Sequence, residues 1–155
     1  MRIAVLQERA AGESRVAATP ETVRKFVALG ASVAVESGAG EGASIPDAAY
    51  EEAGAELGQA QDVVKGADIV LAVRAPAAKA LEGAKPGAWV AATFDPFNER
   101  QCVADYAAAG LEALAMEFMP RITRAQSMDV LSSQSNLAGY KAVLAAANEY
   151  GRVFP

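Results

Sequence analysis

Hydrophobic residues gather in short runs that recur through the first three quarters of the chain. Five runs are rich in valine, isoleucine, leucine and alanine, and Gly, Asp or Pro residues bound them. Runs of this length and composition predict β-strands. Because they are apolar on both faces and alternate with helical patterns, they predict a mainly parallel sheet. The predicted strands are RIAVL (2–6), SVAVE (32–36), DIVLAV (68–73), AWVAAT (88–93) and LEALAM (111–116).

Helical patterns fill the segments between these runs. The clearest is TPETVRKFVALG, in which Thr19 predicts the N-cap, Pro20 the first helical position and Gly30 the C-terminal stop. With right-handed crossovers, the alternation predicts a Rossmann-like three-layer α/β fold, in which helices flank the sheet. The other predicted helices span residues 46–55, 61–67, 77–83 and 98–110.

The longest helical pattern runs from about Ser127 to Tyr150, and no sixth strand is predicted after it. A compact α/β domain does not need such a helix, which is typical of a connection between domains. We therefore interpret residues 1–120 as an N-terminal α/β domain. Residues 121–155 are interpreted as a functional loop and a long connecting helix that leads into a further domain.

Composition narrows the classes of function. The net charge of −5 argues against nucleic acid or an anionic membrane as the main partner. No apolar run approaches the roughly 20 residues that span a bilayer, so direct membrane insertion is not expected, and no signal peptide is recognised. The single cysteine, Cys102, is expected to be a buried, inert thiol in a reducing cytoplasm. The absence of histidine removes the commonest general base and metal ligand, and no metal site is expected.

A glycine-rich segment, ESGAGEGAS (36–44), invites a dinucleotide-binding interpretation. Its glycines, Gly38, Gly40 and Gly42, give G-x-G-x-G rather than G-x-G-x-x-G. Glu41 would place a carboxylate where a pyrophosphate should lie, and the segment follows the second strand rather than the first. We expect a flexible surface loop in which Ser44 caps the next helix.

The loop after the first strand, QERAAGESRVAATP (7–20), lies where ligands gather in open α/β sheets. It contains Arg9 and Arg15 together with Glu8 and Glu13. Solvated ion pairs that contribute little to stability are the favoured interpretation of these charges.

The most unusual segment is PRITRAQSMDVLSSQSNLAGYKAV (120–143), which interrupts an alanine-rich chain with polar groups. On a continuous helix, Gln126, Asp129, Ser133, Asn136 and Tyr140 would share one face, with Ser132 at its edge. A solvated helix face normally carries Glu and Lys, whereas Ser, Asn and Asp compete with the helix for backbone hydrogen bonds. This pattern favours a functional site over an ordinary solvent-exposed helix face.

The chemistry of this segment is that of positioning. Arg, Gln, Asp and Ser supply fixed donors and acceptors, but there is no nucleophile with a histidine base. Such a set suits a reaction in which a bound cofactor does the chemistry and the protein holds it, as in hydride transfer.

The same segment resembles the signature of the NAD(H)-binding alpha component of proton-translocating NAD(P) transhydrogenase. The resemblance extends to QERAAGESRVAATPETVRK, VESGAGEGASIPDAAYEEAGA and ADIVLAV, and so covers the whole chain. It implies direct hydride transfer between NAD(H) and NADP(H), coupled to proton translocation. It also implies that Arg121, Gln126 and Asp129 are catalytic, and that these three and Ser132 bind the cofactor. Gln126 would reach the partner nucleotide, Arg121 and Asp129 would hold the nicotinamide end, and Ser132 would support the carboxamide.

The resemblance also implies partners and a location. NADP(H) would be bound by a partner component, next to a membrane-embedded component, and the chain would form a homodimer. It would lie in the cytoplasm, peripherally at the inner membrane. The family's nucleotide fingerprint lies in a second domain that is absent here, so residues 1–155 alone are expected to be inactive and to bind NADH weakly.

Two alternatives remain open. The substrate domain of an alanine dehydrogenase-like enzyme would use Arg15 for a substrate carboxylate, but its catalytic lysine falls near Ala72 and its histidine has no counterpart. A receiver or binding module would need an acidic pocket after the first strand and an aspartate ending the third. The first strand here ends Leu6-Gln7-Glu8, and the third ends Val73-Arg74.

Overall fold

The computed structural model describes residues 1–152, so the last three residues of the predicted connecting segment lie outside the described residues. The chain divides into two compact units, Met1–Ala115 and Met116–Pro155. The predicted domain boundary at residue 120 stays a prediction.

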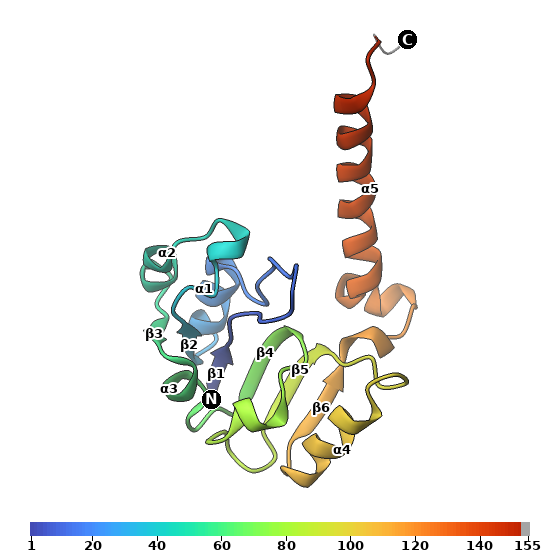
Figure 1. The fold of residues 1–155 in the computed structure, drawn as a ribbon. Coiled ribbons are helices and arrows are strands. Elements are labelled where there is room, and N and C mark those ends of the chain that lie inside the picture. The colour runs from blue at the N-terminus through green and yellow to red at the C-terminus, as the bar shows by residue number, and fades with distance from the viewer. Residues whose placement is uncertain (153–155) are drawn as a thin grey trace. The chain divides into compact units, whose positions relative to one another are not determined.

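A six-stranded sheet forms the first unit, and all of its strand pairs are parallel. The strand order is β3-β2-β1-β4-β5-β6, which confirms the predicted Rossmann-like α/β fold (Figure 1). All five predicted strands are present. The sixth, β3, was missed because it is only three residues long, with the sequence ELG. The strands are β1 (Arg2–Val5), β2 (Ser32–Glu36), β3 (Glu56–Gly58), β4 (Ile69–Arg74), β5 (Trp89–Thr93) and β6 (Glu112–Ala115).

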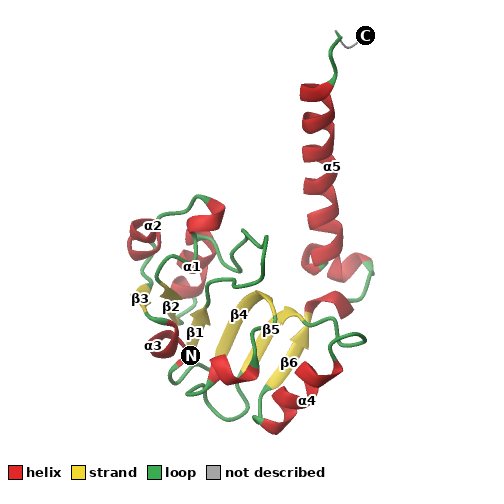
Figure 2. Cartoon of the chain, viewed as in Figure 1, coloured by secondary structure: helices red, strands yellow, loops and turns green. Residues whose placement is uncertain are grey.

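Helices cover the sheet from both sides (Figure 2). On one face, Val23 and Tyr50 from α1 and α2 pack with β1 and β2. On the other face, residues of α3, η2 and α4 pack against β1, β4 and β5. These helices are α1 (Pro20–Ala28), η1 (Glu41–Ala43), α2 (Asp47–Glu52), α3 (Ala60–Val64), η2 (Ala78–Leu81) and α4 (Arg100–Ala108).

The ends of α1 follow the predicted pattern. The Thr19 hydroxyl accepts a hydrogen bond from the backbone N–H of Thr22, and Pro20 occupies the first helical position. Gly30 has a φ of +85°, and its N–H donates to the carbonyl of Val27. A left-handed residue just past a helix end is the usual place for glycine, so the predicted stop is confirmed.

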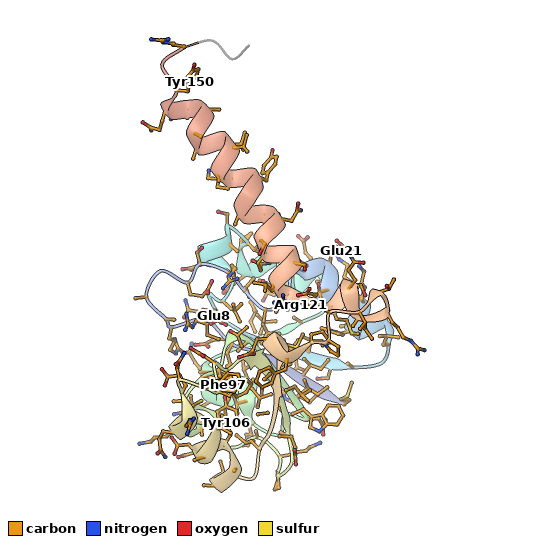
Figure 3. The ribbon with its side chains drawn as sticks, turned by 90° about the vertical axis from the view of Figure 1, so that its right-hand side faces the viewer. Glu8, Glu21, Phe97, Tyr106, Arg121 and Tyr150 are labelled. Atoms are coloured by element: carbon orange, nitrogen blue, oxygen red, sulfur yellow. The ribbon has the colours of Figure 1, made fainter. Side chains whose placement is uncertain are left out.

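The second unit contains two short 3₁₀ helices and one long α-helix. These elements are η3 (Met116–Phe118), η4 (Thr123–Met128) and α5 (Val130–Glu149). None of the 20 residues of α5 is buried. Figure 3 shows Arg121 near the beginning of α5 and Tyr150 at its far end.

Candidate functional site

The polar segment forms two successive helices that meet at Asp129. Arg121 is exposed in the loop that precedes η4. Gln126 lies within η4, and its side chain is exposed. Among residues 1–152, no hydrogen bond to the Gln126 side-chain amide is found. The exposed polar groups of Arg121 and Gln126 are therefore not used to hold this fold together.

Asp129 joins η4 to α5. Its backbone is extended, with φ −74° and ψ 98°, and its carboxylate caps α5. Oδ1 accepts hydrogen bonds from the backbone N–H groups of Leu131 and Ser132 at 3.0 and 3.1 Å. Oδ2 accepts a 2.6 Å hydrogen bond from the Ser132 hydroxyl. Because the first N–H groups of a helix have no partner within it, this cap satisfies donors that would otherwise need water.

The electrostatics of this junction follow from the same contacts. The pKa of Asp129 lies below its ordinary value, mainly because the Ser132 hydroxyl and backbone N–H stabilise the carboxylate. The N–H of Leu131 and the positive charge of Arg121 lower the pKa further. The structure thus brings Arg121, Asp129 and Ser132 into one electrostatic neighbourhood, with Asp129 as a permanent anion at neutral pH.

The prediction of one continuous polar helix face was wrong at its beginning. The helix begins at Val130 rather than about Ser127, because Asp129 is extended and ends η4. Gln126 therefore does not share a helical face with the residues that follow Asp129. Ser133, Asn136 and Tyr140 do lie on α5 at helical spacing, and all three are exposed.

The glycine-rich loop lies at the surface at residues 41–44, as expected, but it is closely packed at two of its glycines. A Cβ at Gly40 would lie 2.5 Å from the carbonyl oxygen of Ile45, and one at Gly42 would lie 2.8 Å from that of Ser14. Ser44 is left-handed, with φ +60°, and ends η1. It does not cap α2, whose N-cap position is Pro46. Glycine is therefore required at these two positions, where the loop closely approaches Ile45 and Ser14.

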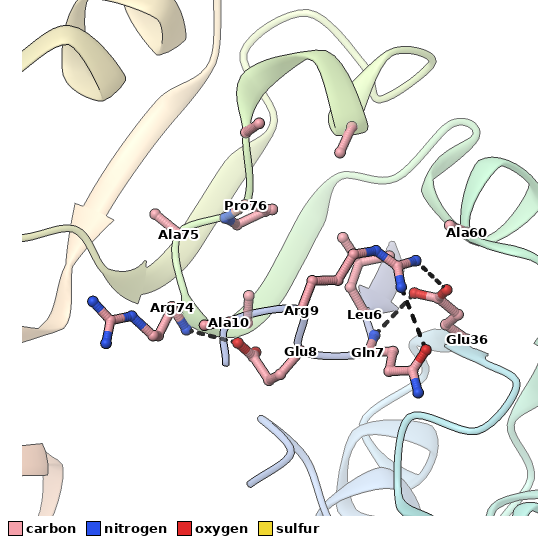
Figure 4. A pocket seen from close by; sticks show the side chains of 13 residues that line it. Leu6, Gln7, Glu8, Arg9, Ala10, Glu36, Ala60, Arg74, Ala75 and Pro76 are labelled. Atoms are coloured by element: carbon pink, nitrogen blue, oxygen red, sulfur yellow. Dashed lines mark hydrogen bonds and ion pairs between the residues drawn. The ribbon is translucent and has the colours of Figure 1, made fainter. Parts of the chain in front are cut away.

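A cavity of about 330 Å³ lies at the carboxyl ends of β1, β2 and β4 (Figure 4). Arg9 pairs with Glu36 at 2.5 Å across this cavity, and the Glu36 side chain is only 9% exposed. Oε2 of Glu36 also accepts from the backbone N–H of Gln7. The remaining lining of the cavity is largely alanine, together with Leu6, Glu8, Arg74 and Pro76.

The expectation of surface ion pairs in the first loop is confirmed for Arg15 and Glu13, which pair with each other, but was wrong for Arg9 and Glu8, whose partners lie elsewhere in the fold. Glu13 holds Arg15 through two hydrogen bonds, at 2.7 Å to Nε and 2.5 Å to Nη2. The Glu13 side chain is mostly buried, and its pKa is lowered chiefly by the hydrogen bond to Arg15. Glu8 instead accepts hydrogen bonds from the backbone N–H groups of Val73 and Arg74.

Sequence reasoning missed the roles that Glu8, Glu36 and Arg74 play around this cavity. The available signal was the position of each charged residue at the end of an apolar strand. Ala72, the position of the catalytic lysine in the alternative interpretation, does line the cavity. Arg15 is held by Glu13 instead, with its side chain half-exposed.

Other expectations concern metals, membranes and the thiol. Within residues 1–152, no cluster of three His, Cys, Asp or Glu residues could hold a metal ion. The same residues include no helix of the length and hydropathy that a membrane span requires.

Cys102 is half-buried against the core, and burial raises the pKa of its thiol. A protonated thiol is a poor nucleophile, in agreement with an inert role.

The fold and the polar junction can now be compared with known proteins. The sequence profile described as "Alanine dehydrogenase/PNT, N-terminal domain" matches residues 4–138, which include η4 and Asp129. The chain belongs to this family.

The chain is similar to transhydrogenases and to alanine dehydrogenases of this family. It is 48% identical over 162 aligned positions to an NAD(P) transhydrogenase subunit alpha protein of Rhodospirillum rubrum, covering all of this chain and 42% of that protein. A crystal structure of transhydrogenase from Sinorhizobium meliloti is 51% identical, with a TM-score of 0.92 over 100% of this chain and 44% of that chain. Alanine dehydrogenase of Mycobacterium tuberculosis is more distant, at 31% identity over 90% of this chain and 37% of that protein.

Two conclusions follow from these comparisons. The greater identity to the transhydrogenase relatives, over the whole chain, favours that branch of the family over the alanine dehydrogenase branch. The chain also spans less than half of the length of each relative.

Proposed function

We propose that this chain is the N-terminal portion of the NAD(H)-binding component of a proton-translocating NAD(P) transhydrogenase. The observation that carries the proposal is full-length similarity to transhydrogenase alpha subunits, with the matched region reaching through the polar junction. NADP(H) would be bound by a partner component beside a membrane-embedded one. The subunit would be homodimeric and lie at the cytoplasmic face of the inner membrane.

The residues present fit one end of NAD(H) but not the other. Arg121 and Gln126 are exposed donors beside the capped carboxylate of Asp129, which suits a polar nicotinamide and its ribose. The pyrophosphate needs a glycine cradle, and the glycine loop at residues 36–44 has the spacing G-x-G-x-G rather than G-x-G-x-x-G. When bound, the nicotinamide ring supplies the hydride chemistry.

The hydrogen-bond geometry supports a division of roles within the junction. The Ser132 hydroxyl donates a hydrogen bond to Asp129, so its oxygen lone pairs remain for an amide N–H such as that of the carboxamide. Asp129 would hold the nicotinamide end by fixing Ser132 and attracting Arg121. Gln126, whose amide is exposed, would bond to the partner nucleotide. Together these groups would align two rings and exclude water, which is what hydride transfer requires of a protein.

The test is hydride transfer between NADH and an NADP⁺ analogue in the complete enzyme. Gln126→Asn and Arg121→Ala should lower the rate, by about tenfold or more if each positions a reacting ring. Gln134→Asn, on the exposed surface of α5, is the matched control. Unchanged rates for Gln126→Asn and Arg121→Ala would remove these residues from the site.

A binding measurement tests the division of the cofactor site. Because the glycine loop at residues 36–44 does not have the spacing of a pyrophosphate cradle, this chain alone should bind NADH weakly or not at all. Isothermal titration calorimetry with NADH measures this directly. A micromolar dissociation constant would contradict the expectation.

An alanine dehydrogenase activity is the second candidate, favoured by the 31% identity to the mycobacterial enzyme and by the cavity beside Ala72. Against it, Arg15 is held by Glu13, and the chain has no histidine. An assay of the longer protein with pyruvate, ammonium and NADH distinguishes the two. Reduction of pyruvate would favour the alternative.

A further inference from the structure

The Glu8 carboxylate occupies a pair of backbone donors at the carboxyl end of β4. Its two oxygens accept hydrogen bonds from the N–H groups of Val73 and Arg74, at 2.5 and 3.2 Å. The register of β4 against β5 shifts between Leu71 and Arg74, and such an irregularity lets two consecutive N–H groups meet one acceptor. Adjacent backbone N–H groups that converge on one point form a binding site for an anion.

An apolar cavity adjoins these donors. Glu8 and Arg74 line the cavity of about 330 Å³, and Figure 4 shows the Arg74 guanidinium extending away from the Glu8 carboxylate. Most of the remaining wall consists of apolar side chains, which include Leu6, Ala60, Ala72, Pro76, Ala77 and Ala80. A group bound at the two N–H donors would therefore have a small apolar space beside it.

We propose that the carboxyl end of β4 is a binding site for a short-chain aliphatic monocarboxylate, and that Glu8 occupies this site from within the protein in the conformation described. The carboxylate of the ligand would take the position of the Glu8 carboxylate on the N–H groups of Val73 and Arg74. Its hydrocarbon chain would lie against the apolar wall of the cavity, where burial of apolar surface is favourable. The site does not depend on hydride transfer, so the inference stands apart from the proposed function.

The charges around the cavity favour a simple monoanion over other ligands. Glu36 and Arg9 pair with each other, and Arg15 is held by Glu13. The paired Glu36 carboxylate is therefore not available to an ammonium group. Because these cations are compensated and the Arg74 guanidinium extends away, a dianion such as phosphate would be poorly neutralised. Two N–H groups instead match the two oxygens of one carboxylate.

The first loop can release Glu8 while the sheet stays paired. Within the first unit, the backbone of residues 8–12 makes one hydrogen bond, in which the carbonyl of Ala10 accepts from the N–H of Glu13. Side chains therefore hold this loop. The Arg9 side chain is 63% exposed where it pairs with Glu36, and exposed ion pairs contribute little to stability. Movement of residues 8–12 would remove Glu8 from its donors and leave the β1–β4 ladder intact.

Titration of the isotope-labelled protein with sodium butyrate tests the proposal, with the amide NMR resonances of Val73 and Arg74 as reporters. In Glu8→Ala the two N–H groups lose their partner, so butyrate should bind at least about tenfold more tightly than to the wild-type protein, where a tethered carboxylate competes. Glu8→Gln should lie between the two, because its side chain still offers one oxygen. Butyrate should bind several-fold more tightly than acetate, because its longer chain buries more apolar surface.

Matched controls separate recognition of a carboxylate from general effects. Glu52→Ala also removes one negative charge, from the exposed side of α2, and should leave the affinity for butyrate at its wild-type value. Butyramide has nearly the shape of butyrate without its charge, and it should shift neither amide resonance. Sodium chloride at the same concentration corrects for ionic strength.

Three results would overturn the proposal. They are the absence of a saturable shift at Val73 and Arg74 in Glu8→Ala, equal affinities of this variant and the wild-type protein, and equal shifts with butyrate and butyramide. If Glu8→Ala does not fold, Glu8→Gln replaces it in the same comparison. Glu8→Gln should then bind butyrate more tightly than the wild-type protein and Glu52→Ala, and equal affinities of the three would overturn the proposal.

Discussion

The Ser132 hydroxyl donates a 2.6 Å hydrogen bond to Oδ2 of Asp129, while the Ser132 backbone N–H donates to Oδ1 of the same carboxylate. One serine therefore holds both oxygens of the acid that begins α5. This contact places two of the proposed cofactor-binding residues in a fixed relation before any ligand arrives. Preorganisation of this kind lowers the cost of positioning a substrate.

Ser132→Ala should raise the pKa of Asp129 toward its ordinary value, because the Ser132 hydroxyl is the largest contribution to its lowering. Carbon-detected NMR titration of the Asp129 carboxyl group measures this shift. Ser133→Ala is the matched control, since the Ser133 hydroxyl bonds to the carbonyl of Val130 and not to the acid. An equal shift in both variants would show that the hydroxyl contact is not the cause.

Acid should weaken the beginning of α5 through Asp129. A carboxylate whose pKa is lowered in the fold contributes stability that is complete above its unfolded value of 3.8 and is lost as pH falls through the folded value. Helical circular dichroism should therefore decrease below about pH 4. In Asp129→Asn the amide oxygen still accepts backbone hydrogen bonds but does not titrate, so this component of the decrease should be absent. A wild-type and variant profile of identical shape would contradict the role of the charge.

The sequence was most informative where a local pattern decides the structure. Thr19, Pro20 and Gly30 marked the ends of α1 because capping depends on neighbouring residues only. β3 was missed because three residues give no periodicity, and its pairing with β2 is decided by tertiary contacts.

At the candidate site, the sequence predicted the residues but not their geometry. Asp129 was assigned to a helix face because its spacing from Ser133 fits a helix. An aspartate followed by unpaired N–H groups is more stable as a cap, and so the helix begins after it. The charges around the cavity were misjudged for a related reason, since the partner of Arg9 is Glu36 on another strand.

Gly42 should be intolerant of a side chain. A Cβ there would lie 2.8 Å from the carbonyl oxygen of Ser14, in a backbone that cannot move without displacing the first loop. Gly42→Ala should lower the free energy of unfolding by about 1–3 kcal/mol, measured by urea denaturation. Gly58→Ala is the control, because its Cβ would make ordinary contacts at 3.5 Å, and its effect should stay within about 0.5 kcal/mol. Equal effects would mean that the close approach to Ser14 is not limiting.

The Glu8 carboxylate should replace the backbone hydrogen-bond acceptors that a longer neighbouring strand would offer to β4. The pairing of β1 with β4 ends at Val5 and Leu71, so the N–H groups of Val73 and Arg74 lie beyond the ladder. The Glu8 carboxylate accepts from both, one to each oxygen. In Glu8→Gln only one oxygen remains, and its amide NH₂ would face a donor, so one backbone N–H loses its partner.

We expect Glu8→Gln to lower the free energy of unfolding by about 1–2 kcal/mol, which is the usual effect of leaving a partly buried donor unsatisfied. Hydrogen exchange is the more specific measurement, because the amides of Val73 and Arg74 should exchange faster while that of Leu71, inside the ladder, should not. Glu52→Gln, on the exposed side of α2, is the matched control. Faster exchange throughout β4 would indicate a general loss of stability and would contradict a local role for Glu8, because only the two N–H groups beyond the ladder depend on its carboxylate.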